Sequence, residues 1–182
     1  MGKSNTKETR EVSKEAVKLI FENLYPAYRD GSNISARANM QKASYLAGIA
    51  FTRAYVGYVH AIAHQLSGFY SLPHGLANAI ILPYVLEYYG KSVHKPLAEL
   101  ADYLQLCKQE DSMEQKANHL IYAIKELNRK MEIPDKVSCI NETDLKINGR
   151  KSIKRSEPTL SGSENFRREG YTSYLSINKT MI

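Results

Sequence analysis

Three of the five histidines of this 182-residue chain lie within one short stretch, at positions 60, 64 and 74. Neutral imidazole is the commonest metal ligand among side chains, and histidine also transfers protons near neutral pH. His60 and His64 are four residues apart, so a helix would present both on one face. His74 follows a proline, at the predicted start of another element. This stretch is therefore predicted to build a chemical site from a helix and the turn that follows it.

Three interpretations of the histidines are compatible with their types and spacing. In the first they are ordinary core or surface residues, although small neighbours such as Gly68 leave room beside the rings. In the second, His60 and His64 bind zinc together as in an HExxH helix, but Ala61 stands where that motif has its glutamate. In the third, one helical histidine and His74 bind a metal, and the other helical histidine faces a cofactor or substrate. The spacing does not choose between the second and third interpretations. Both need further ligands from elsewhere in this chain or from outside it.

Apolar residues at helical spacing predict two helices ahead of the histidines. The first runs from Val12 to Leu24 behind a capping box of Asn5 and Glu8, and Pro26 with Asp30-Gly31-Ser32 is predicted to end it. The second is capped by Ser35. Its apolar face is rich in alanine, which predicts a close helix–helix contact: Ala36, Met40, Ala43, Ala47 and Ala50. The pattern breaks around residues 55–57, before the histidine helix.

Three more helices are predicted after the histidine helix. One runs from Gly75 to Tyr89, contains Pro83, which is predicted to kink it, and stops at Gly90. Two amphipathic helices follow at residues 94–107 and 112–132. No strand-like alternation precedes residue 135. The predicted fold class is therefore all-α, a helical bundle.

The net charge of +6 is unevenly distributed along the chain. Residues 1–145 carry 17 Lys and Arg against 16 Asp and Glu, whereas residues 146–182 carry 8 against 3. The second segment is polar and has no amphipathic period, so it is predicted to be a basic, largely disordered tail. The two predicted domains are residues 1–145, a helical metal-binding domain, and residues 146–182. The tail lacks a helical basic face or an aromatic stacking platform, so nucleic acid is not a favoured partner.

Cysteine usage and hydropathy predict a soluble cytoplasmic protein. Cys107 and Cys139 form no metal-binding or disulfide spacing, which fits a reducing compartment. Residues 1–15 have no apolar signal core. The most apolar run, residues 77–86, is far shorter than the roughly 20 residues of a membrane helix, so no membrane partner is expected. The two remaining histidines are predicted to be solvated surface residues: His94 and His119.

Three motifs carry a resemblance to a known family. They are ASYLAGIAF at residues 43–51, GYVHAIAH at residues 57–64, and PHGLANA at residues 73–79, followed by Pro83. Together they closely resemble the iron-containing (group III) alcohol dehydrogenases over residues 36–89, and more loosely over residues 4–145. The resemblance is greatest to the bacterial branch that acts on simple alcohols and aldehydes.

This resemblance implies the C-terminal helical domain of an NAD(P)-linked oxidoreductase. In that family one Asp and three His hold a divalent metal, usually Fe²⁺ and sometimes Zn²⁺, in a cleft beside the nucleotide-binding domain. The resemblance implies that His60 and His74 are two of the metal ligands. It implies that His64 is not a ligand but a catalytic, cofactor-facing residue that relays a proton near the nicotinamide. The reaction would be hydride transfer between NAD(P) and a small alcohol or aldehyde.

The chain is expected to depart from the family pattern in three ways, one of which is that residues 146–182 do not resemble the family's closing helices. No segment matches a phosphate-binding Gly-rich turn, and the family's Asp and first His ligand precede the segment that resembles residues 2–9. We therefore expect a fragment with two of four metal ligands, inactive by itself. The alternative is a non-catalytic helical module or relic that associates with a separate nucleotide-binding dehydrogenase chain or forms a homo-oligomer.

Overall fold

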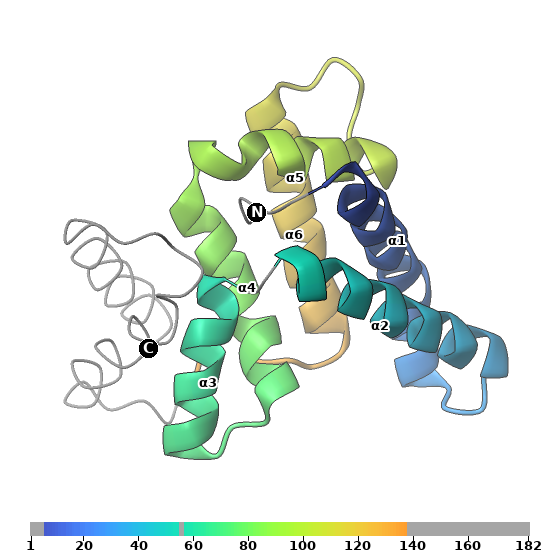
Figure 1. Cartoon of the computed structure of the whole chain (residues 1–182), viewed down its shortest axis with the longest axis vertical. Coiled ribbons are helices and arrows are strands. Elements are labelled where there is room, and N and C mark those ends of the chain that lie inside the picture. Colours follow the sequence, from blue (N-terminus) through green and yellow to red (C-terminus); the bar gives the residue numbers. More distant parts are fainter. Residues whose placement is uncertain (1–5, 55–56, 138–182) are drawn as a thin grey trace. The chain divides into compact units, whose positions relative to one another are not determined.

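The computed structural model describes residues 6–54 and 57–137. This part of the chain is helical and contains no strand, which confirms the all-α prediction (Figure 1). The predicted tail at residues 146–182 and the predicted boundary at residue 145 lie outside the described residues. The helices are α1 (Lys7–Arg29), α2 (Ile34–Ala54), α3 (Tyr58–Tyr70), α4 (His74–Tyr89), α5 (Lys91–Tyr103) and α6 (Met113–Lys130).

The chain divides into two compact units that each draw on two separate stretches of sequence. The first unit comprises Met1–Tyr55 and Lys91–Met131, and so contains α1, α2, α5 and α6. The second comprises Val56–Gly90 and Glu132–Ile182, and contains α3 and α4. All three histidines of the predicted site belong to the second unit.

Helices α1 and α2 of the first unit pack against each other along the alanine-rich face (Figure 1). Ala36 and Ala43 are buried, and the Asn39 Nδ2 donates to the Asn23 Oδ1 at 2.9 Å across the contact. Small side chains let two helix backbones approach closely, because no bulky group separates them. The predicted close helix–helix contact is thus confirmed.

The predicted N-caps of α1 and α2 are wrong. The N-cap of α1 is Thr6, which forms a capping box with Thr9, in place of the predicted box of Asn5 and Glu8. α1 ends at Arg29 with Asp30 as its C-cap, as predicted for Asp30-Gly31-Ser32, whereas Pro26 lies inside the last turn, where the Asp30 amide still donates to the Pro26 carbonyl.

The N-terminal turn of α2 is also capped differently from the prediction. The Asn33 Oδ1 accepts a hydrogen bond from the Ala36 amide at 3.0 Å, so Asn33 occupies the place assigned to Ser35. Both residue types are good helix N-caps. The apolar pattern therefore located the helix, but it did not choose between two capping residues two positions apart.

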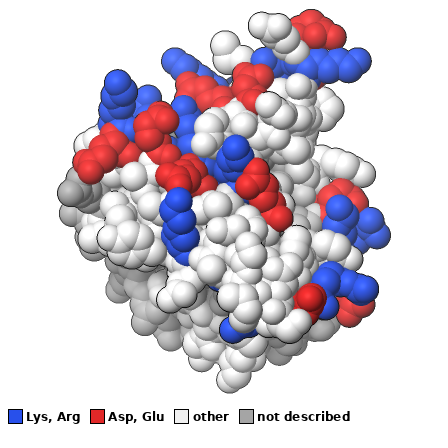
Figure 2. Space-filling view, turned by 90° about the vertical axis from the view of Figure 1, so that its right-hand side faces the viewer, with Lys and Arg blue, Asp and Glu red and all other residues white. Residues whose placement is uncertain are grey.

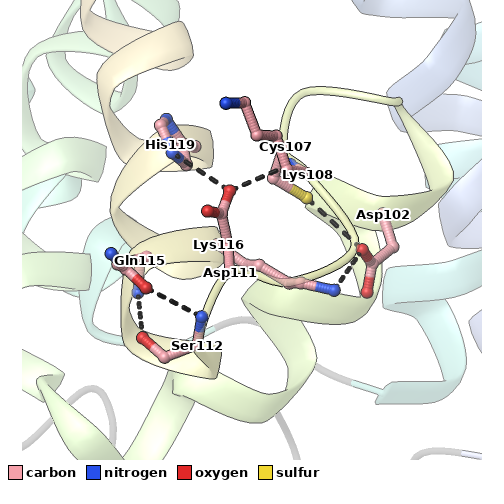
Figure 3. A network of polar contacts seen from close by, with 8 residues as sticks. All are labelled: Asp102, Cys107, Lys108, Asp111, Ser112, Gln115, Lys116 and His119. Atoms are coloured by element: carbon pink, nitrogen blue, oxygen red, sulfur yellow. Dashed lines mark hydrogen bonds and ion pairs between the residues drawn. The ribbon is translucent and has the colours of Figure 1, made fainter.

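A polar network ties the α5–α6 loop to α6 (Figure 3). Lys116 Nζ and Cys107 Sγ both donate to Oδ1 of Asp102, at 2.7 and 3.3 Å. The hydrogen bond from Lys116 lowers the pKa of Asp102, with a further contribution from the Cys107 thiol. Burial and the neighbouring carboxylate raise the pKa of Cys107, so its sulfur stays a protonated donor. The network fixes the loop between two helices that pack together.

The same network includes the N-terminus of α6 and one of the outlying histidines. Ser112 caps α6 in a capping box with Gln115. His119 Nε2 lies 3.5 Å from a carboxylate oxygen of Asp111, and half of the His119 side chain is exposed. His119 is thus a surface residue, as predicted, whereas His94 on α5 is partly buried.

Helices α3 and α4 form an antiparallel hairpin around the core of the second unit (Figure 1). The connection between them is the three residues from Ser71 to Pro73. Fully buried aliphatic side chains from both helices make the core: Ile62, Leu66, Ile80, Ile81 and Val85. The segment after α6 completes it, since Val137 is 4% exposed within the cluster and the Tyr84 hydroxyl donates to the Asp135 carbonyl at 2.6 Å.

The termini of α4 agree with the sequence, with one shift of position. The helix begins at His74, one residue before the predicted Gly75, and contains Pro83 as expected. It ends at Gly90, whose φ of 49° and ψ of −131° fall in a region that favours glycine. The amide of Gly90 donates to the Glu87 carbonyl at 3.1 Å.

Charged side chains of both signs share the surface drawn in Figure 2. Lysines and arginines lie among aspartates and glutamates there. Among the ion pairs of the described residues, Lys42 Nζ lies 2.6 Å from a carboxylate oxygen of Glu15. On this face of the described residues, such mixing leaves no wide area of positive charge that would attract a polyanion. Among the described helices, none is both long and apolar enough to span a membrane.

Candidate metal centre

The rings of the three histidines lie close together on the α3–α4 hairpin. His60 and His64 lie one turn apart on α3, and His74 is the first residue of α4. The centroid of the His74 ring lies 5.5 Å from that of His60 and 4.7 Å from that of His64. The centroids of His60 and His64 are 6.4 Å apart. The structure therefore brings together all three residues singled out in the sequence.

Ring orientation distinguishes the two histidine pairs that involve α4. The His64 and His74 rings are stacked with an interplanar angle of 20°, whereas the His60 and His74 rings are tilted by 57°. An imidazole lone pair lies in the plane of its ring, so stacked rings point their lone pairs alongside each other. Tilted rings can point theirs at a common position.

The distance between His60 and His74 also suits a shared ion. A metal lies about 2 Å from an imidazole nitrogen, so two rings that share one ion have centroids roughly 5 to 6 Å apart. The observed 5.5 Å falls in this range. Within residues 6–54 and 57–137, however, no set of three or more His, Cys, Asp or Glu side chains is placed to hold a metal ion. Among the described residues, the geometry therefore offers a pair of donors, His60 and His74, for a shared ion.

The electrostatic surroundings keep His60 in its ligand form. Partial burial lowers the pKa of His60, and the neighbouring His74 and His64 lower it further, because a cation there would repel any charge on the other two rings. A histidine binds metal only when its nitrogen is unprotonated. At neutral pH, His60 therefore offers a neutral imidazole.

Open space and unpartnered polar atoms lie on the same hairpin. A Cβ added at Gly57, Gly68 or Gly75 would meet no atom within 4 Å. The Ser67 Oγ and the Asn78 Oδ1 are buried and have no hydrogen-bond partner among the described residues. Buried polar atoms are normally paired, so such atoms beside a reactive cluster mark a place for a polar group from outside the hairpin.

Asn78 is the site residue that the sequence analysis did not single out. Its Nδ2 lies 3.0 Å from the His74 Nε2 and 2.8 Å from the His74 carbonyl oxygen. The spacing of four residues between His74 and Asn78 is the one signal that could have identified the pair, since it places both on one helix face.

The chain is similar to known proteins. Residues 2–152 match the model of the Fe-containing alcohol dehydrogenase family, C-terminal. The chain belongs to the iron-containing alcohol dehydrogenase family. This confirms the resemblance carried by the three sequence motifs.

Individual members of the family are similar over a limited part of their own length. Alcohol dehydrogenase 4 of Saccharomyces cerevisiae is 44% identical over 122 residues, which are 66% of this chain and 30% of the yeast protein. The 1,3-propanediol dehydrogenase of Citrobacter freundii is 43% identical over 120 residues, which are 66% of this chain and 31% of that enzyme. The chain thus spans about a third of the length of these curated relatives.

Solved structures of family members share the fold of this chain. A 1,3-propanediol oxidoreductase superposes with a TM-score of 0.85 at 34% identity, over 97% of this chain and 47% of that one. An alcohol dehydrogenase from Oenococcus oeni gives a TM-score of 0.84 at 30% identity, over 100% of this chain and 47% of that one. The chain thus spans about half the length of these two solved chains.

Proposed function

We propose that this chain provides the helical half of a metal-dependent, NAD(P)-linked alcohol dehydrogenase or aldehyde reductase. The observation that carries the proposal is the arrangement of the histidines in a member of this family: His60 and His74 tilted at 5.5 Å, with His64 stacked on His74. The remaining two metal ligands and the nucleotide-binding domain would come from outside the described residues.

The three histidines take different roles in this proposal. His60 and His74 hold a divalent metal, Fe²⁺ or Zn²⁺, through neutral imidazole nitrogens. When bound, such a metal acts as a Lewis acid toward the alcohol or aldehyde oxygen. His64 is exposed on the same face of α3 and stays outside the ligand set, because its ring is stacked against His74. We assign it the transfer of a proton between the substrate oxygen and solvent, beside the nicotinamide.

The substrate class follows from the similar enzymes. Proteins that match this chain include a 1,3-propanediol dehydrogenase from Klebsiella pneumoniae and an NADPH-dependent butanol dehydrogenase from Clostridium saccharobutylicum. We therefore propose a small primary alcohol or the corresponding aldehyde as substrate. Cytoplasmic localisation is part of the same proposal, because the enzyme would use the soluble NAD(P) pool.

Metal content of single histidine variants tests the assignment of ligands. The purified chain is equilibrated with Fe²⁺ under anaerobic conditions or with Zn²⁺, and bound metal is measured by plasma mass spectrometry after dialysis. His60→Ala and His74→Ala should each reduce bound metal by about tenfold or more, since removing one ligand of a small set is costly. His64→Ala should leave the metal content nearly unchanged. Equal losses in all three variants would contradict the division of roles.

Turnover measurements test the dependence on a second component. The chain alone should show no oxidation of NADH or NADPH with propanal, because the groups that bind the nucleotide are supplied elsewhere. Addition of a nucleotide-binding dehydrogenase half should restore turnover, and His64→Ala should lower that turnover without lowering metal content. Turnover by the purified chain alone would contradict the proposed dependence.

A second candidate function is a non-catalytic module that associates with another chain. The observation in its favour is the set of large apolar side chains exposed on α2, where Ile34 is 74% and Tyr45 is 69% exposed. Exposed apolar patches favour association with a nucleotide-binding chain or with a second copy of this chain. Sedimentation of the metal-free chain, with and without such a partner, distinguishes the two candidate functions. The non-catalytic module requires that a complex forms without any metal.

A further inference from the structure

The amide of Asn78 makes two contacts with a single residue, His74. Its Nδ2 lies 2.8 Å from the His74 backbone carbonyl and 3.0 Å from Nε2 of the His74 ring. Asn78 stands one helical turn after His74 in α4, so backbone geometry brings the two side chains together. Its other polar atom, Oδ1, is buried and meets no donor among the described residues.

The contact with the carbonyl determines which end of the amide faces the ring. A carbonyl oxygen only accepts hydrogen bonds, so the amide atom 2.8 Å away must be the nitrogen and not the oxygen. Rotating the amide by half a turn would place two acceptor oxygens against each other. The orientation is therefore held even though it leaves Oδ1 buried without a donor.

The fixed amide in turn determines the tautomer of the imidazole. An amide NH₂ group only donates, so the His74 Nε2 at 3.0 Å must be the accepting, unprotonated nitrogen. In a neutral imidazole the proton then lies on Nδ1. We propose that Asn78 is a positioning residue that holds His74 as the Nδ1–H tautomer and so selects Nε2 as its donor nitrogen.

This role rests on the proposed function, because it prepares His74 to serve as a ligand. A histidine can bind a metal through either nitrogen, provided that this nitrogen carries no proton, so the tautomer determines which one is ready to bind. Here the amide occupies the lone pair of Nε2 in the metal-free chain. An incoming metal would take over a nitrogen that is already unprotonated, while Nδ1 keeps its proton.

Long-range ¹H–¹⁵N correlation spectra of the metal-free full chain test the proposal directly. Spectra are recorded at a pH of about 8.5, above the ordinary histidine pKa of about 6.5, where imidazoles are neutral. His74→Gln identifies the His74 signals by their loss. We expect the Nδ1–H form to dominate at His74 in the natural chain. Asn78→Ala should shift the population toward Nε2–H, and Asn78→Asp should reverse it, since a carboxylate only accepts.

The controls separate a specific effect from a loss of folding. Asn39→Ala also removes an amide hydrogen bond between side chains, but it lies in the other unit and should leave the His74 tautomer unchanged. Circular dichroism checks that each variant remains helical. If both Asn78 variants failed to fold, the His74 tautomer observed in the natural chain would still test the proposal. A dominant Nε2–H form there, or an unchanged tautomer in a folded Asn78→Ala variant, would overturn the proposal.

Zinc addition to the same sample distinguishes this inference from the proposed function. We expect the Nε2 signal of His74 to move on Zn²⁺ binding while Nδ1 retains its proton. Binding through Nδ1 would overturn the role of Asn78. If Zn²⁺ left the His60 and His74 signals unchanged, the ligand pair would be wrong, whereas the metal-free spectra would still support the control of the tautomer by Asn78.

Discussion

The three imidazoles of the α3–α4 hairpin differ in their surroundings although their spacing makes them look alike. His60 is partly buried and its pKa is lowered, His64 is stacked on His74, and His74 is held by Asn78. Residue type and spacing were enough to predict that these three positions lie together. The stacking and the amide contact depend on side-chain rotamers, which the spacing of residues does not determine.

A second ionisable group of the same unit offers a test by pH. Burial raises the pKa of Tyr89 to about 12, and the nearby Tyr58, with ring centroids 6.2 Å apart, adds to the shift. An unfolded tyrosine ionises at about pH 10. Between pH 10 and 12 the unfolded state therefore releases a proton that the folded state keeps, so stability falls as pH rises.

Tyr89→Phe should weaken this alkaline loss of stability, because the phenylalanine ring packs similarly but carries no ionisable hydroxyl. Urea unfolding at pH 9, 10 and 11 measures the effect. Tyr88→Phe is the matched control, since Tyr88 is 45% exposed on the same helix. If both variants changed the slope of the unfolding free energy against pH equally, the assignment to Tyr89 would be contradicted.

At the scale of helices, the apolar period predicted where the elements lie better than where they end. The alanine face of α2 and the glycine stop of α4 were both predicted, because each reflects a strong local constraint. The caps of α1 and α2 were not, since Thr6 and Asn33 compete with neighbouring residues of nearly equal capping strength. α1 continues through Pro26 for one turn and ends before Asp30, the second of the two predicted stops.

The cap of α2 can be tested with two substitutions two residues apart. Asn33→Ala removes the acceptor of the Ala36 amide and should cost about 1 kcal/mol in the free energy of unfolding. Ser35→Ala should change that free energy by less than about 0.5 kcal/mol, as expected for an exposed helical position. Chemical denaturation monitored by circular dichroism compares them. A larger loss of unfolding free energy for Ser35→Ala than for Asn33→Ala would show that Ser35 is the cap, as predicted from the sequence.

Two glycines of the hairpin should respond to alanine with opposite signs. Gly90→Ala forces a side chain into a backbone region that favours glycine and should destabilise by about 1–3 kcal/mol, although its Cβ has room. Gly68→Ala lies within α3, where a Cβ meets nothing within 4 Å, and should stabilise by about 0.5–1 kcal/mol. Melting temperatures of the two variants should therefore move in opposite directions.

At the scale of the whole molecule, each unit is assembled from sequence segments that are far apart. The second unit joins the hairpin to residues after α6, through the Tyr84–Asp135 hydrogen bond and the burial of Val137. The sequence analysis predicted helices along the chain but did not predict this division. The spacing of apolar residues identifies the buried face of each helix, but it does not identify which other segment packs against that face. Family membership covers residues 2–152 and thus both units.

Val137→Ala tests whether the segment after α6 supports the hairpin. Removing two methyl-sized groups from a site that is 4% exposed should cost about 1–3 kcal/mol. Hydrogen exchange should accelerate in α3 and α4 and change little in α1 and α2, which belong to the other unit. Lys136→Ala, at an exposed neighbouring position, is the control. Uniform acceleration in all helices would contradict the division into units.

The three-residue connection between α3 and α4 has a consequence for how quickly the histidine cluster forms. His60 and His74 meet through contacts close in sequence, and closing a loop of about ten residues takes roughly 10–100 ns. Folds rich in such local contacts form rapidly. We therefore expect the histidine cluster to open and re-form without unfolding of α1, α2, α5 or α6. The rate of ligand exchange at the cluster would then be set by local opening of the α3–α4 hairpin.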